Sequence, residues 1–282
     1  MSRGWRLRTR TLPLDRPLLM GIVNVTPDSF SDGGAFLDPQ AAIAHGKALA
    51  EAGADLIDVG GESTRPGAAE VSADDELARV IGVVEALAGE GLAVSIDTAK
   101  SRVAEPALEA GAEVVNDVTA LSDPAMPGLV SGAGAGLVLM HMQGSPRTMQ
   151  VDPIYADVVA EVRDYLVARA ARAEEAGIER DRIAIDPGIG FGKTLEHNLL
   201  LLAGLGELVG TGYPVLVGTS RKTFLGRLTG IDDPARRDLA TAVSVALAAE
   251  RGAAIFRVHD VAASREALAI ATAMVERSET RA

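Results

Sequence analysis

Eight short apolar runs, each broken off by a polar residue, constrain the fold of this chain more than any other feature. Between the runs lie stretches with the period of a helix and connectors rich in Gly, Ala and Asp, so strand and helix alternate eight times. This alternation predicts a parallel sheet closed into a single (β/α)8 TIM barrel, an α/β fold. The polar residues that end the runs are Asn24, Asp58, Asp97, Asn116, Asp117, His141, Asp186, Ser220, Arg257 and His259.

The carboxyl ends of the strands form the active-site face of such a barrel, so these polar endings are the first candidates for a site. An Asp or Asn at such a point can also cap the following helix, and for each residue alone both interpretations stay open. The length of 282 residues suits one barrel at 18–277, with an extension at 1–17 and a tail at 278–282. Alternating residues around Trp5 predict that the extension is an N-terminal hairpin on the closed end of the barrel; a disordered basic arm is the alternative.

Charge and composition exclude several kinds of partner. The net charge of -12 and the aromatic content of 3% argue against binding to nucleic acid or acidic membranes. The chain has no cysteine, which rules out disulfides and thiolate metal sites. It shows neither the apolar segment of a signal peptide nor a run that could span a bilayer, which predicts a cytoplasmic location. An anionic substrate would therefore need local cations, amides or a metal.

Two connections depart from plain barrel architecture. TPDSFSDGG follows the first strand and surrounds the aromatic residue Phe30, whereas GGESTRPGA follows the second strand and carries Arg65 and Pro66 at its tip. Loops over a barrel mouth are candidates for mobile lids, although both also have the composition of ordinary surface turns. Beyond the sixth strand, Phe191 lies between glycines that leave its ring able to flank a planar ligand; a place in the core is the alternative.

Nearly the whole chain resembles the dihydropteroate synthases of folate biosynthesis, in the strings NVTPDSFSDGG, DVGGESTRPGA, SIDT, VNDVT, LMHMQGSPRTMQ, DPGIGFGK, SRKTFLG and FRVHDV. The resemblance is specific, because several long strings agree at once and in order. It implies a Mg2+-dependent transferase that joins 6-hydroxymethyl-7,8-dihydropterin diphosphate to 4-aminobenzoate, giving 7,8-dihydropteroate and diphosphate. It also implies a homodimer that sulfonamides inhibit.

The strand-end residues suit a pterin. A pterin presents adjacent donors and acceptors along one edge, and carboxylates with a carboxamide in a deep pocket can pair with them. Asp97, Asn116 and Asp186 supply these groups, and Lys222 after the seventh strand can donate to the ring while balancing a carboxylate. The resemblance implies the same four residues as pterin ligands, with Asp97 and Lys222 among the catalytic residues.

Positive charge for the diphosphate comes from the eighth strand. Arg257 offers a planar fork of donors, and His259 offers a second donor from the same face. Asn24 at the end of the first strand can give one oxygen to Mg2+, whose remaining ligands would be substrate oxygens and waters. The resemblance assigns these three residues the same duties, counts Arg257 and His259 as catalytic, and adds Val258 to the binding residues.

The resemblance also places 4-aminobenzoate beneath the two loops. The contacts that it implies are Phe30, Asp32, Thr64, Arg65, Pro66, Phe191 and Thr223. A helix that starts near Ser220 would direct its amides at the substrate carboxylate. No strong base is required, because an aryl amine is a neutral nucleophile that can lose its proton after attack.

Two other functions share the pterin ligands. A barrel like the methyltetrahydrofolate methyltransferases would use the same carboxylates but would have no diphosphate to hold, and Lys222, Arg257 and the two long loops argue against it. A catalytically silent pterin-binding paralogue would keep all of these residues. Release of diphosphate on addition of 4-aminobenzoate separates the three possibilities.

Overall fold

The computed structural model describes residues 4–26, 39–63, 68 and 70–279. Eight parallel strands form one sheet in the order β8-β7-β6-β5-β4-β3-β10-β9. A bridge between Ile185 of β8 and Val215, next to β9, connects the two ends of this sheet, so the predicted barrel is confirmed. The strands are β3 (Leu18–Asn24), β4 (Leu56–Gly60), β5 (Val94–Asp97), β6 (Val114–Asp117), β7 (Gly136–Met140), β8 (Ile183–Asp186), β9 (Leu216–Val217) and β10 (Ile255–Val258).

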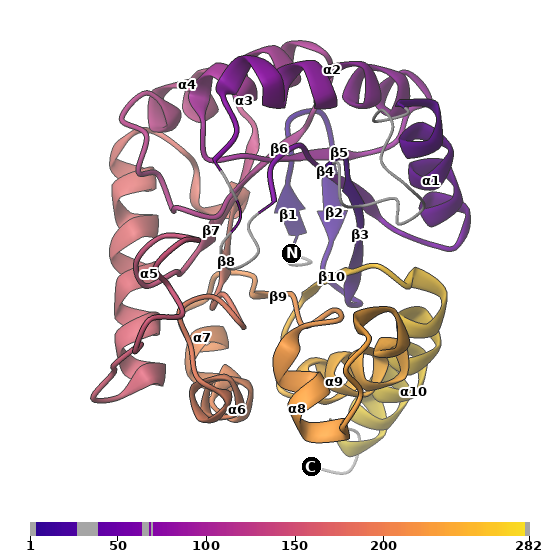
Figure 1. Cartoon of the computed structure of the whole chain (residues 1–282), viewed down its shortest axis with the longest axis vertical. Helices are drawn as coiled ribbons and strands as arrows, with labels where there is room; N and C mark the ends of the chain where they lie inside the picture. Colours follow the sequence, from indigo (N-terminus) through magenta and orange to yellow (C-terminus); the bar gives the residue numbers. More distant parts are fainter. Residues whose placement is uncertain (1–3, 27–38, 64–67, 69, 280–282) are drawn as a thin grey trace.

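Helices surround the strands on the outside (Figure 1). They are α1 (Pro39–Glu51), α2 (Ala73–Gly89), α3 (Ser101–Glu109), α4 (Met126–Ala133), α5 (Val158–Glu175), α6 (Leu195–Ala203), α7 (Leu205–Val209), α8 (Thr223–Thr229), α9 (Asp238–Glu250) and α10 (Val261–Glu279), with 3-10 turns at Arg180–Arg182 and Pro234–Arg236. Helix α10 reaches Glu279, so the segment 278–282 predicted as a tail begins inside it. Among the described helices, none is long and apolar enough to cross a membrane.

Local sequence explains where the longer helices begin. The Ser72 side chain accepts a hydrogen bond from the backbone of Asp75, and the acidic first turn of α2 suits the positive end of the helix. Asp157 caps α5 in the same way, accepting from the backbone amides of Val159 and Ala160. These polar caps fix the positions at which α2 and α5 begin.

The two-residue period of the strands divides the apolar residues into two cores. Outward-facing residues such as Ile57 and Phe256 pack against the helices. Inward-facing residues such as Met20 and Ile255 fill the inside of the barrel near the beginnings of the strands. The polar residues at the other end of the strands therefore lie above a closed apolar floor.

The N-terminal residues form the predicted hairpin, with β1 (Gly4–Arg6) antiparallel to β2 (Thr11–Pro13). Trp5 is fully buried in the inner core, and its indole Nε1 donates to the carbonyl of Arg182 at 2.9 Å. The hairpin is visible in the middle of the ring of elements in Figure 1. Because it packs on the beginnings of the strands, it leaves the carboxyl ends of the strands for a site.

Candidate active site

The barrel strands present their final polar residues at one end. Asp58 is an exception: the prediction that it ends its strand is wrong, because β4 continues to Gly60 and Asp58 lies inside it, fully buried. Its side chain nevertheless faces the other site residues, since it contacts Arg257. The strand ends that match the prediction are Asn24, Asp97, Asp117 and Asp186.

Arg257 lies at the centre of the polar cluster. Its Nε donates to Oδ2 of Asp58 at 2.6 Å, and its Nη2 donates to Oδ2 of Asp97 at 2.7 Å. The Nδ2 of Asn116 donates to the same Asp58 oxygen at 3.1 Å. Since a carboxylate only accepts, this contact fixes the Asn116 amide and leaves its carbonyl oxygen as an acceptor for a ligand. Within the part of the chain that the structure describes, no hydrogen bond occupies Nη1 of Arg257.

Burial sets the charges of this cluster. Desolvation raises the pKa of Asp97, Arg257 opposes this rise, and the nearby charge of Asp58 adds to it. Burial also raises the pKa of Asp186, against the opposing effect of Lys222 and of a 2.7 Å hydrogen bond from the Gly188 amide. Burial disfavours the charge of Arg257, but the carboxylates outweigh it and raise the pKa. The result is one permanent cation among carboxyl groups that ionise reluctantly.

Lys222 joins the end of β8 to the turn after β9. Its Nζ donates to the carbonyl of Ile189 and lies 4.5 Å from the centre of the Phe191 ring. Burial lowers the pKa of Lys222 to about 8, and Asp186 opposes that shift. Phe191 is only partly buried and lies outside the core clusters, so its assignment to the core is not supported. The two residues therefore belong to one cation-π contact at the barrel mouth.

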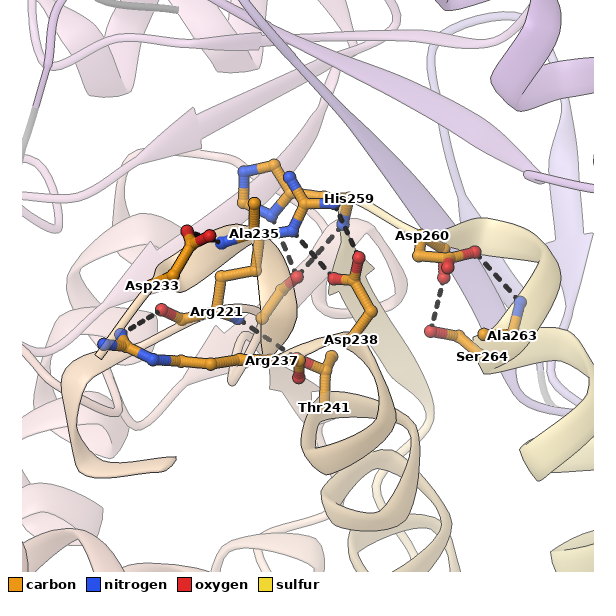
Figure 2. A network of polar contacts seen from close by, with 11 residues as sticks. Arg221, Asp233, Ala235, Arg237, Asp238, Thr241, His259, Asp260, Ala263 and Ser264 are labelled. Atoms are coloured by element: carbon orange, nitrogen blue, oxygen red, sulfur yellow. Dashed lines mark hydrogen bonds and ion pairs between the residues drawn. The ribbon is translucent and has the colours of Figure 1, made fainter. Parts of the chain in front are cut away.

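Helix α9 holds the turn that carries Ser220–Lys222. Arg221 has a φ of +58°, a conformation that a residue with a side chain rarely adopts. Its Nε and Nη2 donate to the Asp238 carboxylate at 2.7 and 2.8 Å, and its amide donates to Thr241 at 3.1 Å. Arg237 donates to the Arg221 carbonyl at 2.9 Å, as Figure 2 shows. The surrounding contacts thus maintain a strained turn beside the site.

His259 takes its orientation from the same turn. The hydroxyl of Ser220 accepts from the His259 amide at 3.1 Å and lies 2.8 Å from the ring Nδ1. A hydroxyl proton directed at Nδ1 leaves the proton of the neutral ring on Nε2, which can then donate to an anion. The helix predicted to start near Ser220 starts later, at Thr223, which is exposed.

The side chains of two predicted residues, Val258 and Asp117, contact other parts of the protein. The side chain of Val258 points outward into the core beneath the helices, as the strand period requires, and its role in binding stays a prediction. Asp117 accepts from the amides of Thr119 and Leu121 at 2.8 and 2.7 Å, so it holds the turn after β6 and does not cap helix α4, whose N-cap is Ala125. The predicted residues outside the described part of the chain are Phe30, Asp32, Thr64, Arg65 and Pro66.

Sequence reasoning missed a buried lysine. Lys193 is 3% exposed, its Nζ lies 3.0 Å from Nδ1 of His141, and it donates to the carbonyl of Phe191 at 2.8 Å. The residue stands in the string DPGIGFGK, where the glycines and Phe191 drew attention instead. A lysine within an otherwise apolar, glycine-rich stretch is the signal that could have identified it.

The described residues contain no group of three or more His, Cys, Asp or Glu side chains suited to a metal ion. Asn24 closes β3 opposite Gly60 of β4 and offers one carboxamide oxygen. Such a hard oxygen ligand fits Mg2+, which commonly completes its shell with substrate oxygens and water. The donor set is thus compatible with an ion that binds together with an anionic substrate.

Residues 20–259 match the family model described as "Pterin binding enzyme". The dihydropteroate synthase of Neisseria meningitidis serogroup C is 49% identical over 268 residues, which cover 94% of this chain and 95% of that protein. The structure of Xanthomonas albilineans dihydropteroate synthase with 4-aminobenzoic acid superposes with a TM-score of 0.91 at 50% identity, covering 97% of this chain and 98% of that one. The complex of the Xanthomonas enzyme with 7,8-dihydropteroate gives 0.88 at 47% identity, covering 96% and 98%.

Proposed function

We infer that this chain, which belongs to the pterin-binding enzyme family, is a dihydropteroate synthase. It transfers the dihydropterin-methyl group from 6-hydroxymethyl-7,8-dihydropterin diphosphate to 4-aminobenzoate and releases diphosphate. The observation that carries this function is the polar cluster at the barrel mouth, in which Arg257 bridges Asp58 and Asp97 beside the acceptor oxygen of Asn116. The cluster combines partners for a pterin edge with a cation for a leaving anion.

The carboxyl groups bind and orient the pterin. Asp97 and Asp186 accept from its amino and ring N–H groups, while the carbonyl oxygen of Asn116, fixed by the contact with Asp58, accepts a further hydrogen bond. Because these groups are buried, an analogue that leaves one of them unpaired binds less well. Lys222 donates to the ring from the opposite side and balances Asp186.

The two sides of the site stabilise opposite charges. As the bond between the pterin methylene and the diphosphate oxygen breaks, positive charge develops on the pterin side and negative charge on the leaving group. The carboxylates face the first charge, and Nη1 of Arg257 with Nε2 of His259 hold the second. The amine of 4-aminobenzoate attacks the methylene carbon and then loses its proton to water.

We propose that Asn24 binds Mg2+ together with oxygens of the diphosphate. The ion would supply positive charge to the leaving group, which suits its preference for oxygen ligands. In calorimetry, Asn24→Ala should weaken the Mg2+-dependent binding of pterin diphosphate and leave the affinity for a bare pterin unchanged. Equal loss of both affinities would show that Asn24 has a structural role.

The second substrate, 4-aminobenzoate, is proposed to lie between Phe191 and the loop residues Phe30, Thr64, Arg65 and Pro66. Binding of pterin diphosphate first would help to order this pocket. Sulfonamides and 4-aminobenzoate should therefore bind weakly to the free enzyme and more tightly when Mg2+ and diphosphate are present. Equal affinity for the empty enzyme would contradict this order.

A homodimer is proposed through α9 and α10, two helices that pack against each other. Their outer surface carries a set of large apolar side chains that are at least half exposed: Leu239, Val243, Leu247, Ile270 and Met274. A second copy of the chain would cover this surface by a two-fold arrangement. Val243→Glu should give a monomer by light scattering, whereas Val167→Glu on α5 should not; an unchanged dimer would overturn the assignment.

The decisive assay measures diphosphate and 7,8-dihydropteroate after the two substrates are mixed, with and without Mg2+. Equal amounts of both products establish the synthase. Pterin binding without release of diphosphate would indicate the silent paralogue. The cytoplasmic location stays a prediction, which cell fractionation would test.

A further inference from the structure

Lys193 is buried where the loop after β8 meets the end of β7. Its Nζ contacts Nδ1 of His141 at 3.0 Å and the His141 carbonyl at 3.4 Å, and it donates to the Phe191 carbonyl at 2.8 Å. An ammonium group offers only donors, so Nδ1 must accept and the ring must be neutral. Burial and the charge of Lys193 lower the pKa of His141 to about 3, in agreement with this assignment.

The backbone of this loop fits closely against the segment that follows β7. Gly188 has a φ of +66°, and a side chain there would overlap the carbonyl oxygen of His141. Gly192 has a φ of +59°, and a Cβ there would lie 2.8 Å from the carbonyl oxygen of Gln143. The two segments are thus in close contact, and Lys193 bonds to acceptors on both of them, His141 and the Phe191 carbonyl.

The same loop carries groups of the proposed site. Phe191 receives the Lys193 hydrogen bond on its carbonyl, while its ring lies against the ammonium of Lys222. Lys222 also donates to the carbonyl of Ile189, two residues before Phe191. Any shift of the loop would therefore move both the aromatic ring and the acceptor of Lys222.

Packing does not require a charge at this position. Burial lowers the pKa of Lys193 to about 7, with Asp186 favouring the charge and Lys222 opposing it. A methionine of similar length would fill the space without that desolvation cost. The amine therefore contributes hydrogen bonds that an apolar side chain could not make.

We propose that Lys193 is a positioning residue of the synthase, which acts through His141 and the Phe191 carbonyl to fix the ring of Phe191 and the acceptor of Lys222. This inference rests on the proposed function for its kinetic consequences. Lys193 contacts neither substrate; it determines where the two groups that do so are held. Its loss should affect the 4-aminobenzoate step more than the binding of a bare pterin by the rigid strand ends.

Four variants test this role. Lys193→Met removes the donor, and His141→Leu removes the side-chain acceptor. His141→Asn keeps an acceptor oxygen near the position of Nδ1 and should preserve function. Lys47→Met is the matched control, because Lys47 forms an exposed ion pair with Glu90, away from the loop after β8.

We expect Lys193→Met and His141→Leu to raise the KM for 4-aminobenzoate about tenfold, as expected for one lost hydrogen bond. The dissociation constant of the bare pterin, measured by calorimetry, should rise by a smaller factor, because Asp97 and Asn116 hold the pterin from strands outside this loop. His141→Asn and Lys47→Met should keep the wild-type KM. If Lys193→Met does not fold, the proposal is tested by the two variants of His141. A raised KM in His141→Leu with a wild-type KM in His141→Asn would support it, and equal KM values would contradict it.

A second readout needs no activity. With 4-fluorophenylalanine at position 191, the 19F resonance of the ligand-free enzyme should shift or broaden in Lys193→Met and stay unchanged in Lys47→Met. An unchanged resonance with an unchanged KM would overturn the proposal. So would equal losses in the KM for 4-aminobenzoate and in pterin affinity that run parallel to a fall in melting temperature, because these would show a general loss of stability. An inactive wild type would refute the synthase instead, and the 19F comparison would still test the positioning.

Discussion

At the scale of residues, the site depends on carboxyl groups that are buried around a single arginine. Asp58 and Asp97 each accept a hydrogen bond from Arg257, and the charge of Asp186 also raises the pKa of Arg257. Burial raises the pKa of Asp97 and of Asp186, and the charge of Arg257 opposes the rise in both. The protonation of these two groups therefore depends on the charges around Arg257.

Asp186→Ala should abolish measurable binding of pterin diphosphate. The substitution leaves buried N–H groups of the ligand without an acceptor, at ~1–3 kcal/mol for each group. Calorimetry with the diphosphate and with a bare pterin provides the measurement. An unchanged affinity in both titrations would remove Asp186 from the pterin ligands.

Lys193 should make stability depend on pH. Burial lowers its pKa from the ordinary 10.5 to about 7, so the unfolded chain holds more protons than the folded one between these values. Stability contributed by this group should therefore rise with pH across that window. Urea unfolding of the wild type and of Lys193→Met at several pH values between them measures it. The free energy of unfolding should rise more steeply with pH for the wild type than for Lys193→Met. Equal slopes would show that Lys193 does not titrate in this range.

At the scale of elements, the loop after β8 is shaped by close contact with the segment after β7. The left-handed Gly188 lies directly against His141, and the Asp186 carboxylate accepts from the Gly188 amide. Asp186, for which pterin binding is proposed, is thus connected to the path of the loop through Gly188. The turn at Arg221 is held in a comparable way by α9.

Gly188→Ala should therefore reduce activity strongly and destabilise the fold, because its φ is positive and a Cβ would overlap the backbone of His141. Gly128→Ala in α4 is the matched control. Apart from the chain neighbours and the backbone of the helix itself, no described atom lies within 4 Å of a Cβ built there, so alanine should stabilise the helix by ~0.5–1 kcal/mol. Thermal unfolding and the synthase assay measure both effects. A tolerated Gly188→Ala would show that the loop can move away from β7.

At the scale of the whole molecule, the barrel separates stability from chemistry. The hairpin and the apolar floor occupy the beginnings of the strands, whereas the polar cluster occupies their carboxyl ends. Trp5 is the largest side chain among the fully buried residues and connects the hairpin to Arg182. Changes at this end should act on folding and leave the site intact.

Trp5→Ala should lower the free energy of unfolding by ~3–5 kcal/mol, because it leaves a large cavity in the inner core. The KM values of the remaining folded enzyme should not change. Trp5→Phe, which keeps much of the volume but loses the indole donor, should cost less. A large change in either KM would mean that the hairpin and the site are coupled.

The sequence alone determined the architecture and most of the site's location. Its apolar runs reflect burial on both faces of a parallel strand, and this local property predicts the barrel and strand ends such as Asp97 and Asp186. The alternating residues around Trp5 predict the hairpin. The outward direction of Val258 also follows from that period. The aminobenzoate loops remain a prediction from sequence.

Only the tertiary structure decided which polar residues become partners. Asp58 and Arg257 are 199 positions apart, and Lys193 and His141 are 52 positions apart. No local pattern specifies such pairs, because their distances depend on strand register and barrel closure. The same holds for charge, since burial and neighbours across the barrel set each pKa. Barrel closure likewise placed Asp97 beside Arg257, 160 positions away, whereas Asp117 accepts from Leu121, four positions further on.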